Sequence, residues 1–440
     1  MIRRDALSEY VRASLWVLPA LSVVGALALG ALLSAVNVGV HSPLAFQGTP
    51  DDARDLLIGI SGTMVTVIAL LLGLTVVALQ LSSTQFSPRL LRNFLRDRPN
   101  QIVLSAFVAT FAYSVAGLYT VGFSGGNRTA NFPRLAVSGS LVLLFLSLGL
   151  LVFFADHLGH SIQVDTIMNG VQRNTLRVIE HGLLTGGEDP PEVPAGATVV
   201  TSRVSGYVQA VRCRDLLSEA ARYGVCVRLR PRIGEHVVAG TTLAWIWPVG
   251  AGSEVSAGRA APDLRRFTPA LEKWVRIGFE RTLEQDAAFG IRQLIDTACK
   301  ALSPAVNDPY TAIQAIDHLA VIFCVLAQRS LGDHVARQPG GAAVIVPGWR
   351  FSGYLAVMCG LIRRYGASEP TVASALLGLL TACANAADGD AEICAAIEEQ
   401  AAIIVADTER EVPQPLDLVP VLADAENVRQ AVLRQRQLRS

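Results

Sequence analysis

Four long stretches without a charged residue dominate the first 155 positions and limit what the chain can fold into. They cover residues 13–36, 56–81, 101–123 and 135–155, and each has more than 20 residues. At about 1.5 Å of rise per residue, a helix of that length reaches about 30 Å, the thickness of the bilayer's hydrocarbon core. A chain in lipid must satisfy its own backbone hydrogen bonds, so the stretches predict four transmembrane helices.

The composition supports an integral membrane protein. Hydrophobic residues make up 51% of the chain, charged residues 17%, and the mean hydropathy is +0.41. A signal peptide is the alternative for the first stretch, but its length and the three spans that follow favour a retained helix. The formal net charge is zero, which argues against a general nucleic-acid binder.

The distribution of arginine predicts the orientation, because loops rich in positive charge stay on the cytoplasmic side. The basic segments carry Arg3, Arg4 and Arg12 before the first span, and Arg89, Arg92, Arg96 and Arg98 between the second and third. The other connections carry Arg54 with Asp51, Asp52 and Asp55, and Arg128 with Arg134. We expect a multi-pass protein with both termini in the cytoplasm.

The connection between the second and third spans is amphipathic. Ser87 can cap a helix and Pro88 suits its first turn. The apolar side is formed by Leu90, Leu91, Phe94 and Leu95, and the basic side by Arg89, Arg92 and Arg96. This pattern predicts a short helix on anionic lipid headgroups. An ordinary basic cytoplasmic loop is the alternative.

Small residues recur every three or four positions along the second span. They are Gly59, Gly62, Thr66, Ala69 and Gly73, and the third span has a similar row, Ser105, Ala109, Ala112 and Ala116. Such rows allow helices in lipid to approach closely. The second-span row is therefore expected to pack inside a four-helix bundle, or to line a subunit contact or a pore. Because no charged residue lies inside a span, an ion-coupled transporter is disfavoured.

The remaining chain predicts a mixed cytoplasmic part behind the four-helix transmembrane domain of residues 1–158. We expect a stalk helix and linker over 159–194, a small β-rich module over 195–260, and a mainly α-helical domain over 261–440. The phrase IGEHVVAGTTLAWI is similar to the turn-and-strand pattern of lipoyl-like sandwich barrels, but no lysine occupies a hairpin tip. The seven cysteines form no CxxC pair, which argues against a disulfide framework or a zinc ribbon. No metal site and no cofactor are predicted.

A polar helical hairpin is the most distinctive feature of the second half. Arg292 and Asp296 are spaced to pair along one helix, which Ser303-Pro304 should end. Asp308 should cap the next helix, with Pro309 in its first position.

The segments ERTLEQDAAFGI (280–291) and ALSPAVNDPYTA (301–312) carry a resemblance, together with LSSTQFSPRLL (81–91) after the second span. With four spans before them, they resemble a bacterial family of predicted membrane proteins, domain of unknown function family 2254. The resemblance covers nearly the whole chain. It implies a shared architecture and a bacterial cytoplasmic membrane, and it transfers no catalytic residue.

Two interpretations of the hairpin remain open. Its polar residues could bind a cation or a small polar ligand, or they could satisfy one another around a capped turn. The candidate ligand-binding residues are Asp286, Arg292, Asp296, Asn307 and Asp308. No phosphate-binding loop, nucleophile elbow or zinc-protease motif occurs in the sequence.

The leading hypothesis is a non-enzymatic homo-oligomer with a cytoplasmic sensing or assembly domain and a channel-like role. The alternatives are a membrane-anchored enzyme or ligand sensor that uses Asn307 and Asp308, and a scaffold for another membrane complex. Membrane lipids are the predicted partners.

Overall fold

The computed structural model describes residues 16–36, 45–85, 98–121, 132–161, 163–186, 189–250 and 267–438. The chain divides into two compact units, residues 1–166 and 167–440. Each unit has its own core and is described by itself.

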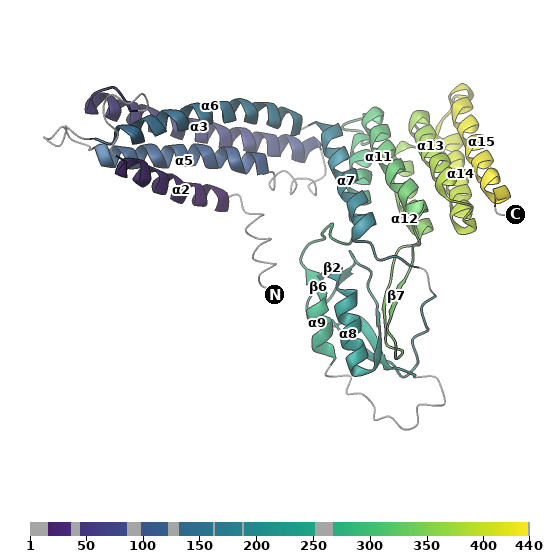
Figure 1. Cartoon of the computed structure of the whole chain (residues 1–440). Helices are drawn as coiled ribbons and strands as arrows, with labels where there is room; N and C mark the ends of the chain where they lie inside the picture. Colours follow the sequence, from purple (N-terminus) through teal and green to yellow (C-terminus); the bar gives the residue numbers. More distant parts are fainter. Residues whose placement is uncertain are drawn as a thin grey trace. The chain divides into compact units, whose positions relative to one another are not determined.

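The N-terminal unit consists of long apolar helices that run alongside one another (Figure 1). They are α2 (Val17–Ala35), α3 (Pro50–Gln85), α5 (Arg98–Val121) and α6 (Arg134–Ser161). Helix α5 is central, because α2, α3 and α6 all pack on it. Each of the four predicted spans falls on one of these helices.

Hydroxyl groups fasten the helices of this unit to one another. The buried Tyr113 of α5 donates a hydrogen bond of 2.7 Å to the carbonyl of Ala136 at the start of α6. Further along, Thr110 Oγ1 and Ser147 Oγ lie 2.9 Å apart, and Ser22 of α2 donates to the Ser105 carbonyl at 2.9 Å. A neutral hydroxyl can donate a hydrogen bond without bringing a charge into an apolar interior. Such groups therefore suit a helix bundle surrounded by lipid.

The first turn of α3 is fixed by a capping box. Thr49 and Asp52 each accept a hydrogen bond from the other's backbone N–H, at 3.2 and 2.8 Å. The neighbouring segment is held by Arg134, whose guanidinium donates to the carbonyls of Phe46 and Gly48 at 2.7 and 3.1 Å. Arg134 thus ties the segment before α3 to the start of α6.

The outward surface of the N-terminal unit is apolar. Its exposed large side chains include Leu21, Val24 and Leu32 on α2, Leu70 and Val76 on α3, and Val142, Phe145 and Val152 on α6. An apolar surface that encircles a bundle is typical of a membrane segment and unfavourable in water. Among the described residues, five helices are long and apolar enough to span a membrane: α2, α3, α5, α6 and α11 (Pro309–Ala327) of the second unit.

The second unit contains two small β-sheets. One has the strand order β1-β5-β3-β8-β7, with β1 (Thr198–Thr201), β3 (Val225–Leu229), β5 (Thr242–Pro248), β7 (His334–Arg337) and β8 (Ala343–Val346). The other has the order β4-β2-β6, with β2 (Gly206–Val211), β4 (His236–Val237) and β6 (Val275–Gly278). Strands β3 and β8 are parallel, whereas the other pairs are antiparallel.

The core of the β-rich part lies between the sheets and two short helices, α8 (Cys213–Tyr223) and α9 (Thr268–Trp274). Helix α8 contributes Leu216 and Ala220, and it ends at Gly224, whose φ of 64° suits glycine. Strands β4 and β5, which bracket the Gly240 turn, belong to different sheets. The strands also extend beyond the predicted 195–260 range, because β6, β7 and β8 follow it in the sequence.

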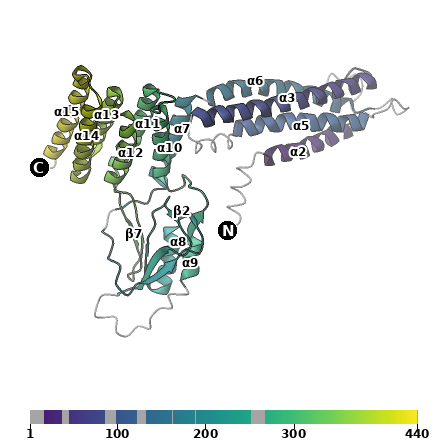
Figure 2. The same cartoon turned by 180° about the vertical axis from the view of Figure 1, so that it is seen from behind.

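The helical part of this unit is arranged in two rows (Figure 2). Consecutive contacts link α10 (Ala287–Ala301), α12 (Phe351–Gly366) and α14 (Ala391–Glu411) in one row. The other row contains α11, α13 (Pro370–Ala386) and α15 (Pro415–Leu438). Helix α7 (Val164–His181) approaches α10 so closely that a Cβ at Gly290 would lie 1.9 Å from Thr175 Oγ1.

The last helix begins earlier than the prolines in its sequence suggest. Pro413 and Pro415 predict a linker and a final helix from about residue 424, but α15 begins at Pro415 and continues through Pro420. Pro415 lies in the first turn, where a missing N–H costs little because the first helical N–H groups have no carbonyl partner within the helix. Packing of α15 against α13 and α14 then outweighs the loss of one hydrogen bond at Pro420.

Candidate functional site

The segment 280–291 joins the three-stranded sheet to α10. Gln209 of β2 donates to the Glu280 carbonyl at 2.8 Å, and Gln285 accepts from the backbone N–H of Val211 at 2.9 Å. Arg276 of β6 forms an ion pair with Glu284. Three side-chain bonds within six residues thus connect the sheet to the helical rows.

An ion pair between the half-buried Arg281 and the buried Asp286 lies at the centre of this junction. Arg281 contacts the Asp286 carboxylate with both Nε and Nη2, at 2.9 and 3.0 Å. Asp286 also caps α10, since Oδ1 accepts from the Phe289 N–H at 3.1 Å. Asp286 is 4% exposed. Burial raises the pKa of the Asp286 carboxyl above its usual value, and the Arg281 guanidinium opposes that rise.

Backbone packing closes the site on the other side. Gly234 has a φ of 85°, and a Cβ there would lie 2.0 Å from Asp286 Oδ2. Only glycine combines that conformation with so close an approach. The carboxylate is therefore bound by Arg281 and by the N-terminus of α10, and the Gly234 backbone packs closely against it.

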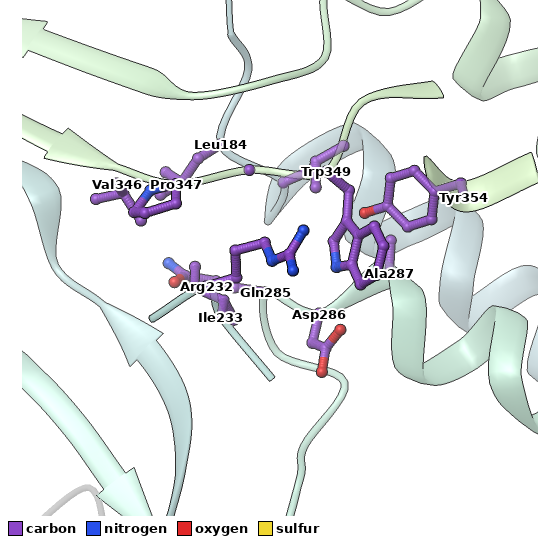
Figure 3. Close-up of a pocket in the computed structure, with 12 residues that line it drawn as sticks. Leu184, Arg232, Ile233, Gln285, Asp286, Ala287, Val346, Pro347, Trp349 and Tyr354 are labelled. Atoms are coloured by element: carbon purple, nitrogen blue, oxygen red, sulfur yellow. The ribbon is translucent and has the colours of Figure 1, made fainter. Parts of the chain in front are cut away.

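A small cavity adjoins Asp286 (Figure 3). Its volume of about 30 Å³ holds about one water molecule. The guanidinium of Arg232 stacks on the Trp349 ring, 4.1 Å from its centroid, and Trp349 packs against Tyr354. Burial raises the pKa of the Tyr354 hydroxyl, and the neighbouring Asp286 carboxylate adds to the rise. A space this small leaves no room for an organic substrate beside Asp286.

The hairpin turn has the predicted capping geometry. Asp308 accepts from Thr311 at both the backbone N–H (3.1 Å) and the hydroxyl (2.6 Å), and Pro309 opens α11. These bonds hold the pKa of Asp308 below its usual value. Asn307 is exposed and has a φ of 50°, a left-handed conformation that asparagine tolerates. The capped turn is confirmed, and both carboxylate oxygens of Asp308 are engaged in it.

The five candidate ligand-binding residues do not form one cluster. Asp286 precedes α10, whereas Asn307 and Asp308 follow it, and the 15 residues of α10 span about 22 Å. Arg292 and Asp296 form the predicted pair along α10, at 2.6 Å. The hairpin thus carries three separate polar contacts.

The small-residue row of the second span lies on the outer surface of the N-terminal unit. Gly59, Gly62, Thr66, Ala69 and Gly73 are all exposed. Among the described residues, nothing lies within 4 Å of a Cβ built at Gly59, Gly62 or Gly73. The inward face of α3 carries larger side chains, among them Leu57, Ile60, Met64 and Leu71.

Two further predictions concern lipid and metal. The candidate headgroup residues Arg89, Arg92 and Arg96 lie outside the described residues. Within the described ranges, no group of three or more His, Cys, Asp or Glu side chains is placed to hold a metal ion.

Sequence reasoning missed several residues of the junction. Arg281, the partner of Asp286, precedes α10 in a segment without periodicity, and Arg232 and Trp349 come from loops after different strands. The short separation of Arg281 and Asp286 in the sequence, with their opposite charges, could have predicted the ion pair. Nothing in the sequence placed Arg232 against Trp349, because that contact depends on how β3 and β8 pair.

Several helices apolar enough to cross a bilayer define the class as a membrane protein. The particular family follows from comparison: the model described as "Predicted membrane protein (DUF2254)" matches residues 12–382, so the chain belongs to that family. The resemblance found in the sequence is thereby confirmed. "Uncharacterized protein Rv1290c" of Mycobacterium tuberculosis (strain ATCC 25618 / H37Rv) is 43% identical over 445 residues, covering 98% of this chain and 83% of the relative. "Uncharacterized protein Mb1321c" of Mycobacterium bovis (strain ATCC BAA-935 / AF2122/97) gives the same values. No solved structure matches.

Proposed function

We propose that this membrane protein assembles into homo-oligomers in the bacterial cytoplasmic membrane. Helices α2, α3, α5 and α6 are its four spans, and the small-residue face of α3 forms the contact between subunits. Both termini and residues 167–440 lie in the cytoplasm, as the arginine distribution of the loops favours.

The observation that carries this proposal is the two-sided character of α3. Its inward face carries large side chains such as Ile60, Met64 and Leu71. On the outward face, Gly59, Gly62 and Gly73 form an open row beside exposed large side chains such as Leu70. Lipid chains solvate apolar side chains of any size, so lipid alone does not favour small residues. A second helix gains from them, because small residues let two backbones approach and increase dispersion contacts.

Hydroxyls on the same surface suit this contact. Thr63 donates to the Gly59 carbonyl at 2.7 Å, and Thr66 donates to the Gly62 carbonyl at 3.2 Å. Each hydroxyl is satisfied within its own helix, so the face can be buried without an unpaired polar group. The same hydroxyls would line a polar path if several α3 helices met around one axis, which is the channel-like form of the proposal.

Helix α11 is assigned to the core of the second unit rather than to the membrane. It packs against α10 and α13 and buries Ile316, Leu319 and Phe323 completely. Its apolar character is accounted for by those neighbours. In the proposed topology, proteolysis of inside-out vesicles cleaves residues 167–440, whereas intact spheroplasts protect them.

The test of the oligomer compares two glycine substitutions in the full chain reconstituted in nanodiscs. Gly62→Leu places a large side chain on the α3 face, and Gly149→Leu does the same on α6, where a Cβ also meets nothing. We expect the wild type and Gly149→Leu to be oligomeric by mass photometry and crosslinking, and Gly62→Leu to dissociate. A monomeric wild type, or equal behaviour of the two variants, would contradict the proposal.

The channel-like form has its own test. Liposomes containing the wild type should conduct ions or release a small dye, and Gly62→Leu should abolish the flux. An intact oligomer without flux restricts the function of the face to assembly.

A further inference from the structure

We propose that an arginine-lined groove in the second unit binds a phosphorylated small molecule with a planar ring, such as a mononucleotide. The groove has a volume of about 470 Å³, within the usual range for ligand sites. Its walls include Arg228, Arg230, Arg232 and Trp245, together with Glu235 and Asp333. All of these residues lie in one compact unit, so the inference is independent of the oligomeric state.

The groove lies at the carboxyl ends of the parallel strands β3 and β8. Leu229 ends β3 and leads into Arg230 and Arg232, while Pro347 and Gly348 follow β8 directly. Chain segments that leave parallel strands at the same edge diverge and leave a crevice between them. Ligands of open sheets with parallel strands commonly bind at that edge.

The charges in the groove do not balance. Arg228 pairs with Asp333 at 3.2 Å, and the other oxygen of Asp333 accepts from the Gly348 N–H at 3.2 Å. A single carboxylate, Glu235, serves both Arg230 and Arg232, at 3.5 and 3.9 Å. Three guanidinium groups thus face two carboxylates, and the two contacts of Glu235 are long.

Guanidinium geometry then favours phosphate over a simple counterion. Each guanidinium offers several N–H donors in one plane, which matches the oxygens of a phosphate group. Arg230 is 44% exposed, so its donors are accessible from the groove. Arg232 is oriented by stacking on Trp349 at 4.1 Å, which reduces the entropy lost when a ligand binds.

An aromatic side chain in the groove supports the presence of a planar ring in the ligand. Trp245 of β5 is the cross-strand partner of Arg228, so the two side chains project from the same face of the sheet. Trp245 is half-buried and lines the groove. An indole beside a guanidinium can stack a planar base while the cation binds its phosphate. The groove is also larger than phosphate alone would require.

The test measures binding of AMP, adenosine and inorganic phosphate to the full chain in nanodiscs of zwitterionic lipid, by isothermal titration calorimetry. We expect saturable binding of AMP that is tighter than that of adenosine or phosphate and that weakens with added salt. Absence of saturable AMP binding, or equal affinities for AMP and adenosine, would overturn the proposal.

Two variants that change the net charge of the groove in opposite directions provide the decisive control. Arg230→Gln should weaken AMP binding about tenfold, because it removes a charge-assisted hydrogen bond to the phosphate. Glu235→Gln should tighten it, because it releases Arg230 and Arg232 from their shared carboxylate. A structural disturbance would weaken binding in both variants, so a shift in the same direction overturns the assignment.

Further variants separate the two halves of the ligand. Trp245→Leu should weaken the binding of AMP but leave that of phosphate unchanged. Arg203→Gln is the matched control, because Arg203 is a 74% exposed arginine of the same unit paired with Glu272. If Arg203→Gln weakens AMP binding as much as Arg230→Gln does, the effect is one of overall charge and the groove is not the site.

Discussion

The two units differ in the charge of the polar side chains that they bury. In the N-terminal unit the buried polar side chains are mainly hydroxyls, such as Thr110 and Ser147, and many large apolar side chains are exposed on its surface. The second unit buries many apolar side chains and also the Asp286 carboxylate, which pairs with the half-buried Arg281. The difference reflects the surrounding solvent: lipid penalises any charge, whereas a protein surrounded by water can bury one with a partner and still expose many others.

The largest expected loss of stability follows from breaking the ion pair between Arg281 and Asp286. Arg281→Met leaves the Asp286 carboxylate buried without its cation and should lower the free energy of unfolding of the second unit by about 3–5 kcal/mol. Urea unfolding followed by tryptophan fluorescence measures this, since four of the five tryptophans lie in residues 167–440. Arg276→Met, which removes an exposed partner of Glu284, should lower it by less than about 1 kcal/mol.

The effect of pH on this variant follows from the direction of the pKa shift. Because the pKa of Asp286 is raised in the folded state, the folded protein binds the proton more tightly than the unfolded chain, and stability falls as pH rises through that interval. Removing Arg281 raises this pKa further. The loss caused by Arg281→Met should therefore shrink as pH is lowered, and a loss independent of pH would contradict a buried carboxylate as its cause.

A second effect concerns close helix packing. Gly290→Ala forces α7 and α10 apart at Thr175 and should lower the free energy of unfolding by about 1–3 kcal/mol. The matched control is Gly170→Ala on α7, where a Cβ meets nothing within 4 Å; it should be neutral or slightly stabilising. Thermal unfolding by circular dichroism would show the contrast, and equal melting temperatures would contradict the packing account.

The hairpin cap should produce a smaller effect. Asp308→Ala removes the bonds to Thr311 and should lower the free energy of unfolding by about 1 kcal/mol at neutral pH, while Asp308→Asn retains most of the cap. The lowered pKa of Asp308 means that its charge-dependent contribution is complete above the ordinary value of 3.8 and is lost as pH falls through the folded-state value. The difference between wild type and Asp308→Asn should therefore disappear in strong acid.

The smallest expected effect lies in the N-terminal unit. Thr110→Val removes the hydroxyl contact with Ser147 and should lower stability in detergent by about 0.6 kcal/mol, the average for hydrogen bonds between membrane helices. Unfolding in increasing mole fractions of denaturing detergent measures the change. A loss as large as that of Arg281→Met would show that a hydroxyl contact stabilises the N-terminal unit as much as the ion pair stabilises the second unit.

The sequence predicted the parts of the fold that depend on local pattern. The apolar stretches coincide with α2, α3, α5 and α6, and Asp308-Pro309 marked the start of α11 correctly. Strands β6 and β7 were missed, since each has four residues and acquires its identity from a partner distant in the sequence. The start of α15 was missed because a proline such as Pro415 is common both in linkers and in the first turn of a helix.

In the candidate site, too, local sequence pattern pointed to some residues, whereas others depend on how distant segments pack. Asp286 was proposed from the sequence as a ligand-binding residue, a role that stays a prediction. Its neighbours Arg281 and Gly234 were not singled out, since the approach of Gly234 depends on the pairing of β2 with β4. The small residues of α3 were recognised by their spacing. Periodicity alone does not tell which side of a helix faces its own bundle, so their outward position required the structure.

The central place of α5 has a consequence for biogenesis. Helices α2 and α3 are synthesised first, yet both pack mainly on α5, which follows them. On leaving the insertion machinery, they would remain loosely associated until the third hydrophobic segment arrives. A nascent chain stalled before residue 98 should thus expose the glycine row of α3 and the inner side of that helix together, and become a preferred client of membrane chaperones and quality-control proteases.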